Sequence, residues 1–185
     1  MSETLPLATI HEAVLQFLKG RDDVVLFGAQ AVNAYVQEPR MTQDIDLITT
    51  HGAALAEEIK VHLGQKFHIA VRVRTVADGN GFRIYQIRKP KNRHLVNVRS
   101  VADLPNAERI ADILVMSPVA LIAAKVAAYA NRRGQPKSGS DWRDIAFLLL
   151  AFPELKQHSG LVSEQLQKDG ADQELLHIWQ TLVDQ

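Results

Sequence analysis

Residues 24–49 contain the pattern that most constrains the fold of this chain. A short apolar run at 24–27 ends at Gly28, and residues 29–36 then carry apolar side chains at helical spacing. This order predicts a strand, a tight glycine turn and a helix. A glycine at such a turn lets the backbone approach a ligand, and the start of the helix directs N–H groups toward an anion. Gly28 is equally compatible with an ordinary turn.

Two aspartates accompany the next predicted strand, at 45–48. Asp44 and Asp46 are two residues apart, and because side chains alternate along a strand, both carboxylates face the same way. Their Cα atoms would be roughly 6.5–7 Å apart, so both side chains can reach one divalent cation. Hard carboxylate oxygens suit Mg²⁺ or Mn²⁺. An Asp-x-Asp pair alone also occurs on the polar face of a half-buried strand, so the preceding strand, glycine and helix give it weight.

The rest of the pattern predicts an α+β fold, with a mixed sheet flanked by helices over 1–116 and a C-terminal helical region over 117–185. Three segments rich in β-branched residues predict an antiparallel hairpin or meander. These strands are expected at 68–76, 82–88 and 95–101. Thr9 and Glu12 form the sequence of a capping box, and Ser117 before Pro118 is a helix start. Further helices are expected at about 9–19, 52–63, from 117, at 142–152 and within 161–184, with a loop at 134–140.

Composition excludes several classes of protein. With 46% apolar and 23% charged residues, the chain has the composition of an ordinary globular protein. It contains no cysteine, which excludes disulfide scaffolds, thiolate zinc sites and cysteine nucleophiles. No apolar run approaches the roughly 18 residues that span a bilayer, and the N-terminus lacks the order of a signal peptide. We therefore expect a cytoplasmic protein with no membrane partner. The oligomeric state stays open.

Charge is balanced in total but distributed unevenly. The formal net charge is zero, yet residues 72–99 contain eight lysines or arginines and one acid. Residues 154–185 contain six acids and two lysines. Two interpretations follow: either solvated surfaces differ in sign, or the basic segment is a cradle for phosphate.

Two stretches of the chain resemble the nucleotidyltransferase superfamily. Residues 27–31 (Phe-Gly-Ala-Gln-Ala) and 40–47 (Arg-Met-Thr-Gln-Asp-Ile-Asp-Leu) are similar to its strand–glycine–helix–Asp-x-Asp signature. The closest likeness is to the AbiEii-type toxin nucleotidyltransferases. Residues 117–144, with Lys125 and the run Asp-Trp-Arg-Asp at 141–144, resemble the helical region of those proteins. Together the two motifs bracket about residues 24–150.

The resemblance implies an activity. A nucleotidyltransferase of this kind moves a nucleoside monophosphate from a nucleoside triphosphate to an acceptor, here RNA, a protein or a small molecule. Mg²⁺ or Mn²⁺ would be the cofactor, held by Asp44 and Asp46, and a toxin–antitoxin system would be the setting. The alternative is a catalytically impaired member that only binds nucleotide or another protein.

The resemblance also assigns residues by position. The expected catalytic residues are Asp44, Asp46, Lys125 and Asp141. The expected nucleotide-binding residues are Gly28, Ala29, Arg40, Thr42 and Asn97. Lys125 would place a positive charge against the triphosphate, or it is a solvated lysine that interrupts an apolar helix. Asp141 is either a site residue or the N-cap of the following helix, and Asp144 either shares the site or solvates that helix.

Two positions depart from the pattern of active members. Asn97 stands where they commonly have a third carboxylate; an asparagine can ligate a metal through its oxygen but cannot act as a base. The turn contains Gly28 and Ala29 where Gly-Gly or Gly-Ser is usual, so a hydroxyl contact to phosphate is missing. Thr42 either replaces that contact or satisfies local backbone groups.

Overall fold

The computed structural model describes residues 5–185, which divide into two compact units. The first comprises the described residues up to Gln30 together with Arg40–Val115, and the second comprises Ala31–Pro39 and Met116–Gln185. Helix α2 (Gly28–Tyr35) contributes its first turn to one unit and the remainder to the other. No helix within residues 5–185 combines the length and apolar character needed to cross a membrane.

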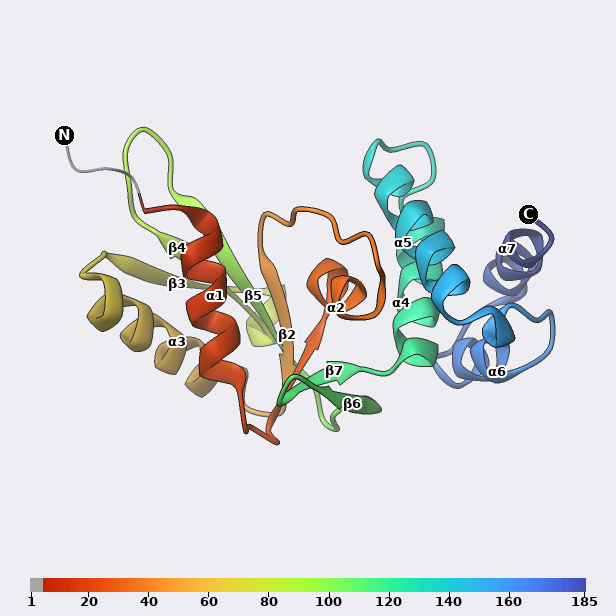
Figure 1. Ribbon diagram of the computed structural model, residues 1–185, viewed down its shortest axis with the longest axis horizontal. Helices are drawn as coiled ribbons and strands as arrows, with labels where there is room; N and C mark the ends of the chain where they lie inside the picture. Colours follow the sequence, from red (N-terminus) through yellow and green to blue (C-terminus); the bar gives the residue numbers. More distant parts are fainter. Residues whose placement is uncertain (1–4) are drawn as a thin grey trace. The chain divides into compact units, whose positions relative to one another are not determined.

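A seven-stranded mixed sheet forms the centre of the first unit, with strand order β3-β4-β5-β2-β1-β7-β6 (Figure 1). The strands are β1 (Val24–Phe27), β2 (Ile45–Thr49), β3 (Val71–Val76), β4 (Gly81–Gln86), β5 (Arg93–Ser100), β6 (Ala107–Ile110) and β7 (Ile113–Met116). β3, β4 and β5 are antiparallel neighbours, which confirms the predicted meander. β2 is antiparallel to β1 and parallel to β5, so the start of β2 lies beside the end of β1.

Helices α1 (Leu7–Leu18) and α3 (Gly52–Phe67) supply the core that packs on this sheet. Ile10, Val14, Leu55, Ile59 and Leu63 are all fully buried. Side chains of this size contribute about 1.5–3 kcal/mol each when they leave water. A short 3₁₀ turn, η1 (Ala77–Gly79), joins β3 to β4.

The predicted start of the first helix is wrong. α1 begins at Leu7, directly after Pro6, and no side chain caps it, so Thr9 and Glu12 lie inside the helix rather than at its end. The backbone N–H of Ile10 bonds the carbonyl of Pro6. Pro6 is the N-cap residue, with φ −60° and ψ 142°, so the boundary lies three residues earlier than the N-cap that the capping-box pattern gives, Thr9.

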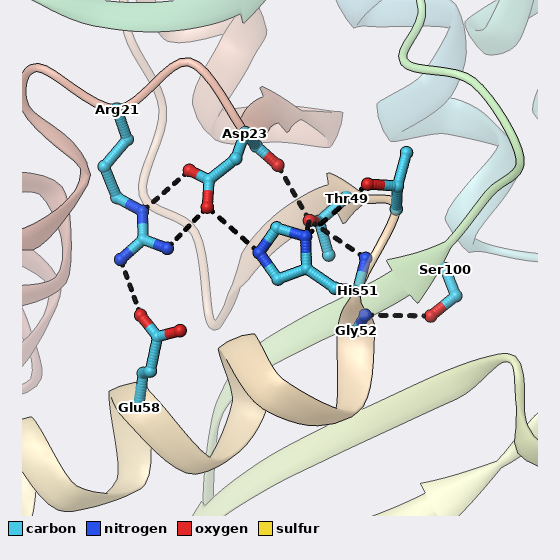
Figure 2. A network of polar contacts seen from close by, with 8 residues as sticks. Arg21, Asp23, Thr49, His51, Gly52, Glu58 and Ser100 are labelled. Atoms are coloured by element: carbon cyan, nitrogen blue, oxygen red, sulfur yellow. Dashed lines mark hydrogen bonds and ion pairs between the residues drawn. The ribbon is translucent and has the colours of Figure 1, made fainter.

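Where β1 begins and β2 ends, a polar network joins both strands to α3 (Figure 2). Arg21 donates through Nε and Nη2 to the two carboxylate oxygens of Asp23 at 2.9 and 2.7 Å, and through Nη1 to Glu58 at 2.7 Å. His51 Nε2 lies 2.9 Å from Asp23 Oδ2, and the buried Thr49 hydroxyl donates to the Asp23 carbonyl at 2.7 Å. The network fixes the loop that precedes β1.

We expect the contribution of this network to stability to disappear in acid. Hydrogen bonding from Arg21 is the main cause that holds the pKa of Asp23 below its ordinary 3.8. A carboxyl with a lowered folded-state pKa stabilises the fold above 3.8 and loses that effect as the pH falls through the folded-state value. Asp23→Asn should therefore cost up to about 1 kcal/mol near neutrality, as partly exposed ion pairs do. In thermal unfolding followed by circular dichroism, the difference in melting temperature between Asp23→Asn and the parent should disappear below pH 3.8. A difference that does not change with pH would contradict this role.

Four helices form most of the second unit. They are α4 (Pro118–Asn131), α5 (Lys137–Ala151), α6 (Leu161–Lys168) and α7 (Gln173–Val183), with a 3₁₀ turn, η2 (Pro153–Leu155), after α5. The predicted start of α4 is confirmed, since the Ser117 hydroxyl accepts from the Ala120 N–H and Pro118 occupies the first turn. Trp179 is fully buried and donates through Nε1 to the Gln157 carbonyl at 3.1 Å.

The predicted loop at 134–140 is wrong in its second half, because α5 already begins at Lys137. Two serines and a glycine in this stretch favour a loop by propensity, but Ser138 and Ser140 each donate to a carbonyl three residues earlier. Such local bonds are compatible with a helical turn, and packing of α5 against α4 overrides the weak intrinsic preference.

Candidate active site

Asp44 and Asp46 converge on the amide nitrogen of Asn97. Asp46 is the second residue of β2, Asp44 precedes that strand, and Asn97 is the direct neighbour of Asp46 on β5. Asn97 Nδ2 donates to Asp44 Oδ2 at 2.9 Å and to Asp46 Oδ1 at 2.8 Å. The expectation that both carboxylates face the same way is confirmed. The first unit therefore brings together three of the expected site residues.

Gly28 lies directly against the Asp46 carboxylate. Its φ is +70°, and a Cβ added there would be 2.2 Å from Asp46 Oδ2 and 2.9 Å from Cγ. β1 pairs with β2 in the register that places Phe27 opposite Asp46, so the chain turns into α2 immediately beside the carboxylate. Both the backbone conformation and the lack of space require glycine here. Gly28 is therefore the turn glycine and also the residue whose backbone lies against Asp46, while its approach to a ligand stays a prediction.

Gly28→Ala should displace Asp46 as well as strain the backbone. A positive φ costs a residue with a Cβ about 1–2 kcal/mol. Gly79→Ala is a matched control, because Gly79 has φ +92° with nothing within 4 Å of an added Cβ. We expect Gly79→Ala to lose thermal stability only through its backbone, and Gly28→Ala to lose more, because Asp46 must also move; thermal unfolding followed by circular dichroism measures both. Equal losses in the two variants would contradict the close approach.

Ala29, Arg40 and Thr42 belong to the first unit near the same end of β2. Ala29 lies in the first turn of α2, whose N–H groups have no earlier helical carbonyl to bond. The Thr42 hydroxyl is 3.3 Å from Gln30 Oε1 in that turn, so the loop before β2 is tied to the start of α2. The guanidinium of Arg40 donates at 3.5 Å to the carbonyl of Met41.

His94 is a neighbour of the carboxylates that the sequence analysis missed. Its Nδ1 lies 3.2 Å from Asp44 Oδ2, and its ring stacks on Tyr85 with centroids 4.9 Å apart. His94 and Asn97 are three residues apart, which in a regular strand would place them on opposite faces. The pairing of β4 with β5 shifts between Ile84 and Tyr85, so that His94 reaches the same face as Asn97. A bulge of this kind leaves no clear signal in one sequence.

A second histidine, His11 of α1, lies buried within the electrostatic influence of Asp44. Burial lowers its pKa below the ordinary 6.5, although the Asp44 carboxylate and a hydrogen bond with the Gln43 backbone act in the opposite direction. His11 is therefore favoured in its neutral form. Within residues 5–185, no three histidine, aspartate or glutamate side chains come together as a metal site, so the oxygen donors here are the two carboxylates.

A row of arginines extends across the sheet from the carboxylates. Direct strand neighbours have side chains on the same face, and the register runs from Asp46 through Asn97 and Arg83 to Arg74. Arg99, two residues after Asn97, shares that face, and its guanidinium lies 5.2 Å from the centre of the Phe27 ring. The side chains of Arg72, Arg74, Arg83 and Arg99 are exposed. We refer to these four residues as the arginine row.

Lys125 and Asp141, the remaining expected residues, lie together in the second unit. Lys125 Nζ is 2.7 Å from Asp144 Oδ2 and 3.5 Å from Asp141 Oδ1, and Arg132 donates to Asp141 at 2.8 Å. Lys125 is 8% exposed and Asp144 is fully buried, so the interpretations of a solvated lysine and a solvating aspartate are wrong. Asp141 is not an N-cap, because α5 begins four residues earlier.

The chain matches a known protein family over most of its length. The family described as "Nucleotidyl transferase AbiEii toxin, Type IV TA system" matches residues 12–183. No curated protein gives a match to the chain.

Several solved structures share the fold. The Megavirus polyadenylate synthase superposes with a TM-score of 0.65 at 12% identity, over 83% of this chain and 33% of that one, so this chain spans about a third of its length. JHP933 from Helicobacter pylori gives a TM-score of 0.58 at 15% identity, over 96% and 88% of the two chains. ANT(2")-Ia in complex with adenylyl-2"-tobramycin gives a TM-score of 0.51 at 14% identity, over 95% of each chain. These likenesses confirm the predicted α+β nucleotidyltransferase-like fold with a C-terminal helical region.

Proposed function

This chain belongs to the AbiEii nucleotidyltransferase toxin family, and from that premise we propose that it transfers a nucleoside monophosphate from a nucleoside triphosphate to an acceptor. The observation that carries the proposal is the convergence of Asp44 and Asp46, whose oxygens lie 2.9 and 2.8 Å from one nitrogen of Asn97. Two carboxylates that meet at one point beside a glycine turn suit a site for a metal-bound triphosphate.

The donor set fits Mg²⁺ or Mn²⁺. Both cations prefer oxygen ligands, and the Asn97 amide donates hydrogen bonds to both carboxylates where they converge, which supports a negative potential at that point. A divalent cation bound there would neutralise the charge of the phosphates during transfer. Gly28 and Ala29 would receive phosphate oxygens at the first turn of α2, and Arg40 and Thr42 would contact the nucleotide from the adjoining loop.

Lys125 and Asp141 enter the proposal through the family likeness. Their ion pair, together with Asp144 and Arg132, supports a role in fixing the helical motif of the second unit.

The arginine row supports an acceptor that carries several phosphates, and we propose RNA. Four exposed guanidinium groups share the sheet face of the carboxylates, and guanidinium groups bind phosphate in a bidentate manner. Binding of this kind weakens as salt rises, because each neutralised phosphate releases counterions. A protein or small-molecule acceptor would not need such an extended row.

A second function is favoured by Asn97. Without a third carboxylate at this position, a member of the family that binds nucleotide and catalyses no transfer is chemically consistent, because an amide cannot accept the proton of the acceptor. Nucleotide binding without turnover would identify this alternative.

The test uses the purified chain with Mg²⁺ or Mn²⁺, total cellular RNA, and each of the four triphosphates labelled at either the α- or the γ-phosphorus. Transfer breaks the bond between the α-phosphorus and pyrophosphate, so α-label should enter RNA while γ-label should not. Chelation with EDTA should abolish labelling, and rising salt should weaken it. Nucleotide binding without labelling of RNA, protein or small molecules would establish the binding module, and absence of both would reject the nucleotide site.

A further inference from the structure

Asn97 occupies the position between the carboxylates at which a cation would bind. Its Nδ2 has two N–H groups, and one is directed to Asp44 and the other to Asp46, at 2.9 and 2.8 Å. The opposite orientation of the amide would place its oxygen against two carboxylates, which is repulsive, so the surroundings determine which side faces them. Asp46 and Asn97 are direct neighbours where β2 pairs with β5, so the sheet fixes the backbone positions of both residues.

Two carboxylates that converge repel each other unless a positive group separates them. A cation does this in a metal-bound site, and a pair of N–H dipoles does it here. We propose that Asn97 is a positioning residue that replaces the cation in the free protein and thereby lowers the affinity of the site for free divalent ions. This inference rests on the proposed role of Asp44 and Asp46 as metal ligands.

The consequence concerns the order of binding. A divalent ion that enters without nucleotide must break two hydrogen bonds from Asn97 and gains, among the acidic and histidine side chains of residues 5–185, two carboxylate ligands. Phosphate oxygens complete the coordination of Mg²⁺ in many nucleotide sites, so an ion that arrives with a triphosphate loses the same bonds but gains more ligands. Asn97 therefore favours a site that stays free of metal until nucleotide binds.

Two variants test the inference by metal binding alone. Asn97→Asp replaces the donor by a third carboxylate, and Asn97→Ala removes the donor and adds no charge. We expect Mn²⁺ to bind without nucleotide about tenfold or more tightly to Asn97→Asp than to the parent, because affinity in such sites rises with ligand charge. The Mn²⁺ affinity of Asn97→Ala should lie between those of Asn97→Asp and the parent. Electron paramagnetic resonance of free Mn²⁺ gives the affinities.

Thermal unfolding supplies a second readout. In EDTA, both variants should have a lower melting temperature than the parent, because the carboxylates lose the group that separates them. Mn²⁺ should raise the melting temperature of Asn97→Asp more than that of the parent. Asn80→Asp, at an exposed position at the turn before β4, controls for an added charge elsewhere. Parent affinity for Mn²⁺ equal to that of either Asn97 variant, or unchanged melting in EDTA, would overturn the inference. If the expected order holds while no transfer is detected, the proposed function fails and the role of Asn97 stands.

Discussion

Replacing both Asp44 and Asp46 with alanine should lower nucleotidyl transfer by on the order of a thousandfold or more, because a metal supplies several kcal/mol of charge stabilisation. Asp44 is partly exposed and precedes β2, and the variant takes these carboxylate partners from Asn97 and His94. The sheet itself does not depend on these side chains, so the variant should fold. Incorporation of α-labelled nucleotide, with saturating Mg²⁺, measures the loss.

Asp103→Ala is the matched control for this experiment. Asp103 is an exposed acid of the same unit, outside any strand or helix, and its removal changes the net charge in the same direction. We expect full transfer activity from it. Undiminished labelling by the Asp44→Ala/Asp46→Ala protein would remove the two carboxylates from the mechanism, whereas equal loss in both proteins would indicate a general effect of charge.

Local patterns predicted the part of the site that depends on neighbouring residues. The alternation of a strand is sufficient to place Asp44 and Asp46 on one face, and a glycine between an apolar run and a helix is sufficient to predict the turn at Gly28. Resemblance added Asn97, but nothing local indicates that its amide nitrogen lies between the carboxylates. That contact depends on β2 pairing in parallel with β5, across about fifty residues of chain.

Features that depend on irregular or distant pairing could not be predicted. His94 reaches Asp44 only because the β4–β5 register shifts, and a bulge has no distinct pattern in a single sequence. β6 and β7 were not predicted: each has four residues, too few for periodicity to be measured, and unlike the equally short β1 neither ends at a glycine. The pairing of Lys125 with Asp144 could not be predicted from the sequence either, because it requires α4 and α5 to pack side by side.

The Lys125 pairing has the largest structural consequence in the second unit. The Lys125 ammonium and the Asp144 carboxylate are 2.7 Å apart, and Asp144 is fully buried. Removing Asp144 takes away the nearer carboxylate of Lys125 and leaves Asp141, 3.5 Å from Nζ, to balance a charge that water barely reaches. Taking both Lys125 and Asp144 away and filling the space with apolar atoms costs much less, and Asp141 keeps Arg132 as a partner.

Asp144→Ala should therefore lower the free energy of unfolding of the second unit by about 3–5 kcal/mol, whereas Lys125→Met combined with Asp144→Leu should recover most of that loss. Both tryptophans of the chain, Trp142 and Trp179, belong to this unit, so their fluorescence during urea unfolding reports on it selectively. Asp184→Ala, which removes the exposed contact with His158 in the same unit, is the control and should cost less than about 1 kcal/mol. If Asp144→Ala unfolds at the urea concentration of the parent, the Lys125–Asp144 pair does not stabilise the second unit. If the double variant is as unstable as Asp144→Ala, packing volume rather than the unpaired charge explains the loss.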